Sequence, residues 1–93
     1  MIIGILTVDI EIPSAYSLKD KRRVLNRIRS RVRQKFNVAI SEISQQNIWN
    51  YACLAAVTVS SHQQHANRVL SKVLELIELL PDCEVADVTM EFL

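Results

Sequence analysis

Hydrophobic and polar residues alternate with two different periods along the chain, and the change of period marks the predicted elements. Residues 2–12 alternate as a strand does, with Leu6, Val8 and Ile10 on one face and a mixture of aliphatic and acidic side chains on the other. Pro13 ends this strand because proline has no amide hydrogen to donate to a neighbouring strand. One face of the strand is therefore predicted to be buried.

The next stretch, residues 17–36, has apolar residues at steps of three and four, which predicts one long amphipathic helix. The apolar stripe consists of Leu18, Val24, Leu25, Ile28, Val32 and Phe36. Ser17 is predicted to cap the helix, with Asp20 three residues later in the position of a capping box. Asn37 is predicted to close it in the left-handed conformation.

The second half of the chain repeats strand and helix patterns. Strands are predicted over 38–45, 51–60 and 85–93, and a second helix runs from a Ser61 cap, with Gln64 completing a capping box, to Pro81. Polar residues between the first two of these strands indicate a hairpin tip. The strand over 51–60 is apolar on both faces, so it is predicted to be central, and the pattern does not decide which face Leu54 and Ala56 occupy.

The resulting order is strand, helix, strand, strand, helix, strand. With right-handed crossovers this order predicts an α+β, ferredoxin-like β-α-β-β-α-β sandwich, in which two helices cover one face of a four-stranded antiparallel sheet. The 93 residues form a single domain, residues 1–93, and the hydrophobic fraction of 49% is sufficient for one core. The strands over 2–12 and 51–60 are predicted to be central.

Charge is distributed unevenly along the chain. Nine of the eleven Lys and Arg residues lie in the first helix, where Asp20 is the only acid, although the net charge is only +1. Like charges at four-residue spacing cost about 0.2–0.5 kcal/mol per pair. Two interpretations stand: a solvated face balanced by acids elsewhere in the fold, or a surface for an anionic partner such as RNA. The candidate nucleic-acid-binding residues are Lys19, Lys21, Arg22, Arg23, Arg27, Arg29, Arg33 and Trp49.

Two of these candidates have a structural alternative. Lys21 falls within the apolar stripe, so either its stem covers the core while its ammonium reaches water, or it grips a ligand at the sheet margin. Trp49 lies at the polar hairpin beside Tyr51, so it either packs at the base of the hairpin or stacks on an unpaired base.

The sheet face without helices is predicted to carry Ile3, Ile5 and Thr7 together with acids of the first and last strands. An uncovered face with this much aliphatic surface favours a partner, and two such faces packed in a two-fold homodimer are the simplest solution. The alternative is a small apolar patch on a monomer.

No pattern in the chain indicates catalysis, a metal or a cofactor. The single glycine, Gly4, lies inside a strand, so phosphate-binding glycine loops are absent, and no nucleophile accompanies the acids of the first strand. His62 and His65 lack a nearby cysteine or carboxylate and are predicted to be exposed residues. Two cysteines are too few for a disulfide framework, and no membrane span or signal peptide is present, so a reduced cytoplasmic protein is expected.

Two stretches carry a resemblance to a known family. Residues 16–25, YSLKDKRRVL, resemble the HSLKEKR opening of the YlxP-like family of small bacterial proteins, and residues 36–43, FNVAISEI, resemble its FNVSVAEV stretch. Trp49 matches the family's hairpin tryptophan, whereas Tyr16 stands in place of a histidine and Asn47 in place of an aspartate. The resemblance implies a ferredoxin-like fold and, through the family's gene neighbours in translation initiation and ribosome maturation, a link to the ribosome.

The sequence thus yields two hypotheses of function. The first is a non-catalytic binding module for RNA or the ribosome that uses the basic helix. The second is a homodimeric small-ligand or protein-interaction domain that associates through its open sheet face.

Overall fold

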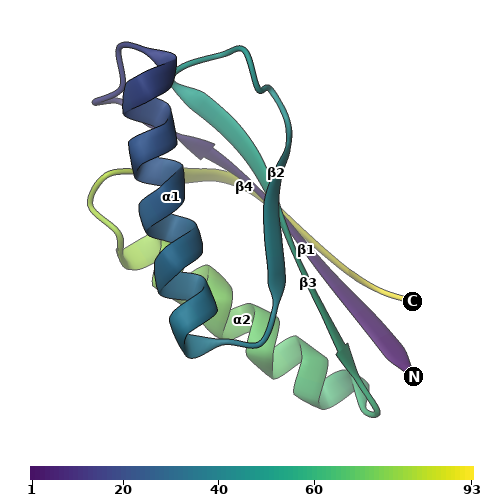
Figure 1. Cartoon of the computed structure of the whole chain (residues 1–93). Coiled ribbons are helices and arrows are strands. Elements are labelled where there is room, and N and C mark those ends of the chain that lie inside the picture. Colours follow the sequence, from purple (N-terminus) through teal and green to yellow (C-terminus); the bar gives the residue numbers. More distant parts are fainter.

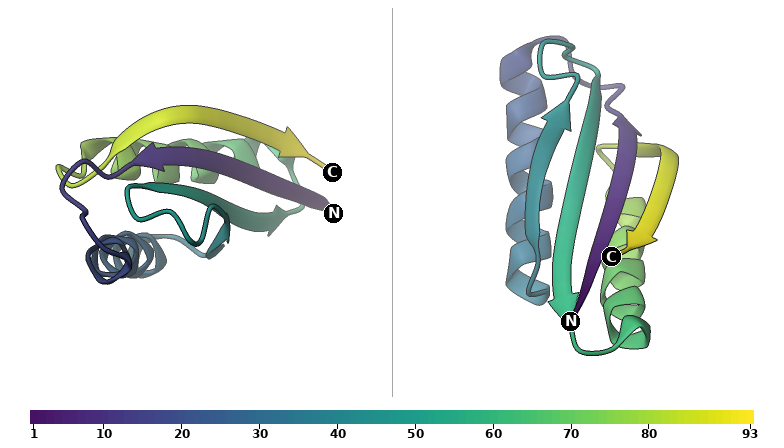
Figure 2. Two further views of the ribbon diagram at one scale, coloured as in Figure 1. Left: turned by 90° about the horizontal axis from the view of Figure 1, so that it is seen from above. Right: turned by 90° about the vertical axis from the view of Figure 1, so that its right-hand side faces the viewer.

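The computed structural model describes all residues 1–93 and shows a four-stranded antiparallel sheet with both helices on one face (Figure 1). The elements are β1 (Ile2–Glu11), α1 (Leu18–Lys35), β2 (Ala39–Ser44), β3 (Tyr51–Ser60), α2 (Gln63–Leu79) and β4 (Glu84–Phe92). The strand order is β2-β3-β1-β4, with β1 and β3 central, so the predicted ferredoxin-like topology is confirmed. The right-hand view of Figure 2 looks onto the open face of the sheet, with both helices behind it.

The core lies between the helices and the sheet, where the hydrophobic period predicts it. Leu6, Val8 and Ile10 are at most 1% exposed, and the stripe of α1 from Val24 to Val32 packs onto them together with α2. Neither helix is long and apolar enough to cross a membrane.

The pairing register between β1 and β3 determines which residues of β3 face the core, a point that the sequence pattern does not decide. Val8 pairs with Leu54 and Leu6 with Ala56, and residues opposite one another in a sheet share a face. Leu54 and Ala56 therefore belong to the core, and both are buried. The open face receives Cys53, Ala55, Val57 and Val59 of β3 instead.

The ends of the helices agree only in part with the prediction. The Ser17 hydroxyl accepts a hydrogen bond from the Asp20 amide at 3.1 Å, and the Asp20 carboxylate accepts one from the Tyr16 amide at 3.1 Å, which completes a variant of the capping box. The left-handed turn predicted at Asn37 is wrong, because α1 ends at Phe36 in an extended conformation.

The cap predicted for α2 is also wrong. His62 is the N-cap and makes no side-chain capping bond, and the Ser60 hydroxyl accepts from the His62 amide at 3.1 Å. The helix begins one residue later than the Ser-x-x-Gln pattern predicts, so the first turn of α2 has no side-chain partner.

Strand β2 is shorter than predicted because its pairing with β3 is irregular. The register shifts between Glu42 and Ser44, so Ile43 is left without a partner in the ladder. Gln45, which follows, is the only residue other than glycine with a positive φ, at 64°. The chain turns there into the hairpin tip, residues 45–50, which lies beside the start of α1 (Figure 1).

Candidate nucleic-acid interface

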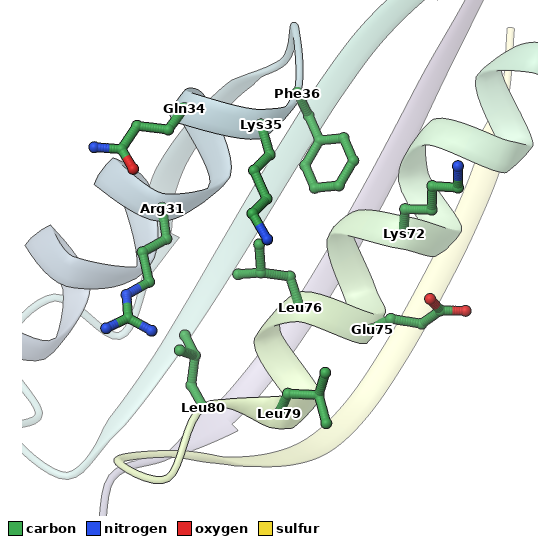
Figure 3. A pocket seen from close by; sticks show the side chains of 9 residues that line it. All are labelled: Arg31, Gln34, Lys35, Phe36, Lys72, Glu75, Leu76, Leu79 and Leu80. Atoms are coloured by element: carbon green, nitrogen blue, oxygen red, sulfur yellow. The ribbon is translucent and has the colours of Figure 1, made fainter.

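The basic residues of α1 separate into two strips, because a step of four residues turns the helix by slightly more than one full turn. One strip begins on the outer surface and winds toward α2, where its last two members line a groove across from the Lys72 side chain (Figure 3). Its members are Lys19, Arg23, Arg27, Arg31 and Lys35. The other strip, Arg22, Arg29 and Arg33, lies on the side of α1 that faces β2, where the Arg33 guanidinium donates to the Ile40 carbonyl at 3.3 Å.

Few of these cations meet a carboxylate. The structure contains two salt bridges, Lys21 with Glu42 and Arg27 with Asp82, so seven of the nine basic residues of α1 remain without an acidic partner. Arg29 donates to the Asn26 side chain at 2.6 Å, a neutral acceptor on the same helix. The positive charge along α1 is therefore largely uncompensated within the chain.

Half of the acids lie on the opposite side of the molecule, along β1 and β4. Asp9 pairs with Asp87 and Glu11 pairs with Glu84 across the two strands, and the fifth acid is Glu91. These positions alternate with buried residues of β1, so the carboxylates face away from the helices. The molecule has one basic side and one acidic side although its net charge is close to zero.

Lys21 does not belong to this surface, and both interpretations of it made from the sequence are wrong. Its side chain is 2% exposed, so the ammonium neither reaches water nor can touch a nucleic acid. The ammonium instead lies 2.7 Å from the Glu42 carboxylate and donates to the carbonyls of Gln45 at 2.7 Å and Ile48 at 2.6 Å. We call this group the Lys21 clamp.

The Lys21 clamp attaches the hairpin tip to the first turns of α1. The carbonyl of Ile48 is bonded to the amide of Trp49, so the clamp holds Trp49 close to the start of the basic helix. Trp49 keeps 50% of its surface exposed, and Tyr16, which precedes α1, keeps 76%. Trp49 is therefore not an ordinary core residue, and part of its ring is free to meet a ligand.

The open sheet face has a different electrostatic character. Partial desolvation and the Asp9 carboxylate raise the pKa of the Tyr51 phenol, and burial followed by Asp9 raises the pKa of the Cys53 thiol. Burial likewise raises the pKa of Cys83, which lies in the core before β4 and not on this face. Both cysteines are thus free, protonated thiols at neutral pH and weak nucleophiles. This face would repel a polyanion.

Comparison with known proteins places the chain in a family. Residues 3–90 match the family described as "Protein of unknown function (DUF503)". The chain belongs to the DUF503 family. It is also 42% identical over 82 residues to the "Uncharacterized protein YlxP" of Bacillus subtilis (strain 168), covering 88% of this chain and 89% of that protein. The resemblance inferred from the sequence is thereby confirmed.

A solved structure supports the fold of this DUF503 chain. The "De novo designed protein Foldit4" superposes with a TM-score of 0.55 at 15% identity, over 98% of this chain and 96% of the designed one. Within the DUF503 chain, the two stretches that carry the family resemblance contain the two ends of the ion pair, Lys21 and Glu42. Sequence reasoning missed this pairing because the residues are separated by a helix and a turn.

We predict that Lys21→Met destabilises the fold by about 3–5 kcal/mol, because it leaves the buried Glu42 carboxylate without its cation and the Ile48 carbonyl without a donor. Urea denaturation of the full chain would measure the loss. Lys19→Met is the matched control, since Lys19 is exposed, and should change stability by no more than about 0.5 kcal/mol. Equal effects of the two substitutions would contradict the clamp.

Proposed function

We propose that the chain is a non-catalytic module that binds RNA along the basic surface of α1. The observation that carries this proposal is the set of seven basic residues on one helix that have no carboxylate partner. A helix that serves only as scaffold gains nothing from such a cluster, because neighbouring like charges destabilise it. A phosphate backbone would supply the missing anions and release counterions on binding.

The strip that faces β2 is the best candidate for the path of the strand. Arg22, Arg29 and Arg33 follow one side of α1, and the hairpin tip with Trp49 lies beside the first turns of the same helix. Arginines would contact phosphates, which give affinity without sequence preference. The exposed part of Trp49 would stack on an unpaired base, an arrangement that suits single-stranded RNA rather than a duplex.

The opposite face of the sheet does not support RNA binding. Sheets of this topology that bind RNA place aromatic side chains on their central strands, whereas β1 and β3 here present aliphatic side chains and acids on the open face, with one aromatic residue, Tyr51, beside the acids. The acids would also orient the molecule with α1 toward a polyanion. We place the partner among cytoplasmic RNAs, including ribosomal RNA, and the two free thiols suit that reducing compartment.

We predict that the chain binds a mixed-sequence single-stranded RNA with an affinity that falls steeply as salt rises from about 50 to about 200 mM. Arg22→Gln and Arg29→Gln should each lower the slope of log affinity against log salt by about 0.7, because each removes one phosphate contact. Fluorescence anisotropy of a labelled RNA would measure both slopes.

The control for this experiment is Arg68→Gln, which removes the same charge from an exposed position on α2. If Arg68→Gln changes the slope as much as Arg22→Gln does, the attraction is nonspecific and the proposed path along α1 is wrong. If the unmodified chain shows no RNA affinity at low salt, the proposal fails altogether.

We predict a different signature for Trp49→Ala. Loss of stacking should weaken RNA binding by about 1–3 kcal/mol and leave the salt slope unchanged, because no phosphate contact is removed. Trp49→Phe should retain most of the affinity. Since Trp49 is the only tryptophan, quenching of its fluorescence by RNA gives an independent reading. Unchanged fluorescence at saturating RNA would remove Trp49 from the interface.

A second candidate function is homodimerisation through the open sheet. It is favoured by the separation of apolar and acidic side chains toward opposite ends of that face. Ile3 pairs with Val59 and Ile5 with Val57 near one end, where Glu91 opposite Ile5 is the single acid, whereas the acid pairs of β1 and β4 gather at the other end. A two-fold axis through the apolar end would bury it in both copies and direct the acidic ends away from each other. Such a dimer would leave α1 free.

We predict that, if this dimer forms, Ile5→Lys converts it to a monomer, because the ammonium would have to be buried in an apolar interface. Light scattering over a range of protein concentrations would show the mass of two chains for the unmodified protein and of one chain for the variant. Val88→Lys, an exposed position on the other face of β4, is the control. A one-chain mass for the unmodified protein at every concentration would exclude the dimer.

A further inference from the structure

A groove of about 610 Å³ lies between the C-terminal halves of α1 and α2, on the helical side of the molecule. Its apolar lining is formed by Phe36, Leu76, Leu79 and Leu80. Figure 3 shows Leu76 and Leu80 directed into the space between the two helices. Leu79 is 83% exposed, so the groove ends in an aliphatic side chain that nothing in the chain covers. An exposed leucine beside an apolar groove marks a surface suited to a partner.

The rim of the groove is mainly basic. Arg31 and Lys35 of α1 stand on one side and Lys72 of α2 on the other, with Glu75 as the single acid. None of these three cations forms a salt bridge within the chain. The groove therefore combines an apolar floor with a net positive rim, which favours a ligand that has an apolar face and carboxylates beside it.

A second copy of this chain does not offer such a ligand. Helix α1 is basic along its exposed surface, and the exposed part of α2 carries Arg68 and Lys72 as well as Glu75 and Glu78. The acids of the open sheet lie on strands, whose backbone cannot enter a groove between two helices as a helix would. Charge complementarity therefore points to a different protein.

The shape of the groove favours a helix over a small molecule as its ligand. Sites for small ligands enclose most of the ligand surface, whereas this groove leaves Leu79 almost wholly in water. A row of residues at steps of three and four on a helix can lie along Leu76, Leu79 and Leu80 and cover them together. RNA has no apolar row to match this floor.

We propose that this groove binds an acidic amphipathic helix of another protein, with its apolar row on the leucines and its carboxylates on Arg31, Lys35 and Lys72. This surface is separate from the strip of Arg22, Arg29 and Arg33, so the proposal does not depend on RNA binding. It assigns a partner of defined chemistry to the end of α1 that turns toward α2.

The test uses a synthetic peptide of about 18 residues, roughly five helical turns, with leucines on one face and glutamates on both flanks. A labelled peptide is titrated with the full chain and binding is followed by fluorescence anisotropy. A second peptide of the same composition, reordered so that the leucines no longer share a face, is the ligand control. We expect the reordered peptide to bind at least about tenfold more weakly.

Variants of the chain test the position of the site. Leu79→Gln should weaken peptide binding about tenfold and leave RNA binding unchanged, because an interface of this kind depends on a few central apolar contacts. Val88→Gln, which changes an exposed aliphatic residue on β4 outside both the groove and the open sheet face, is the control. Both residues are exposed enough for the variants to keep their fold, which urea denaturation would verify. Lys72→Gln should weaken peptide binding and raise its tolerance to salt.

Several outcomes would overturn the proposal. Equal binding of the two peptides would show charge attraction alone, and equal effects of Leu79→Gln and Val88→Gln would place the site elsewhere. Displacement of the peptide by a fatty acid at similar concentration would instead indicate a small anionic amphiphile. Binding to anionic lipid vesicles that Leu79→Gln abolishes, without binding to the peptide, would indicate a membrane surface.

Discussion

The burial of one lysine, Lys21, is the constraint on which the arrangement of the basic side of the molecule depends. A buried ammonium is tolerated only where its charge and its hydrogens all find partners. Here a carboxylate from β2 and two carbonyls from the hairpin tip supply them, all within 2.7 Å. The glutamate in turn has no other partner for its charge. The clamp thus joins the start of α1 to the edge of the sheet, which the end of the helix meets through the hydrogen bond from Arg33 to the Ile40 carbonyl.

The clamp also explains how a short and irregular edge strand keeps a fixed hairpin. Strand β2 has six residues, its register shifts at Ile43, and Gln45 takes a left-handed conformation with φ of 64°. Such an edge would be expected to fray, because few ladder bonds hold it. The ammonium of Lys21 fixes the carbonyl of Gln45 itself, at the point where the chain turns. The backbone beside Trp49 is therefore held from two sides, by Lys21 of α1 at the Ile48 carbonyl and by the Ile12 amide at the Asn50 carbonyl.

These features show which parts of the structure are predictable from the sequence. The alternation in β1 and the stripe of α1 gave the elements and the topology, because period and burial are local properties of the chain. The faces of β3 were not predictable, since both are apolar and only the pairing of Val8 with Leu54 decides them. The cap of α2 failed for a related reason: the pattern at Ser61 fits a capping box, but the chain leaves β3 in a path that makes His62 the cap.

For the candidate site, the positions of the basic residues on α1 were predictable from the sequence, but their partners were not. The helical wheel placed Lys21 among the apolar residues, yet its partners lie at positions 42, 45 and 48 and meet it only when the hairpin has formed. The split of the remaining cations into two strips follows from helix geometry, but what each strip faces depends on the packing of β2 and α2. The groove could not be foreseen, because it requires the ends of two helices to converge.

Basic residues on α1 and acidic residues on β1 and β4 are kept on opposite sides of the molecule, and this separation affects all three candidate surfaces. Carboxylates opposite one another on β1 and β4, and arginines at four-residue steps on α1, both destabilise the elements that carry them. Exchanging a few of these residues between the two sides would relieve both repulsions and leave the net charge at +1. The chain instead keeps a polarised surface. A polyanion would meet α1 first and would be repelled by the sheet, so an apolar contact at the far end of the sheet could form at the same time. Charge would thus direct anionic partners to the helical side and away from the open sheet, and the apolar floor of the groove would separate an acidic helix from RNA.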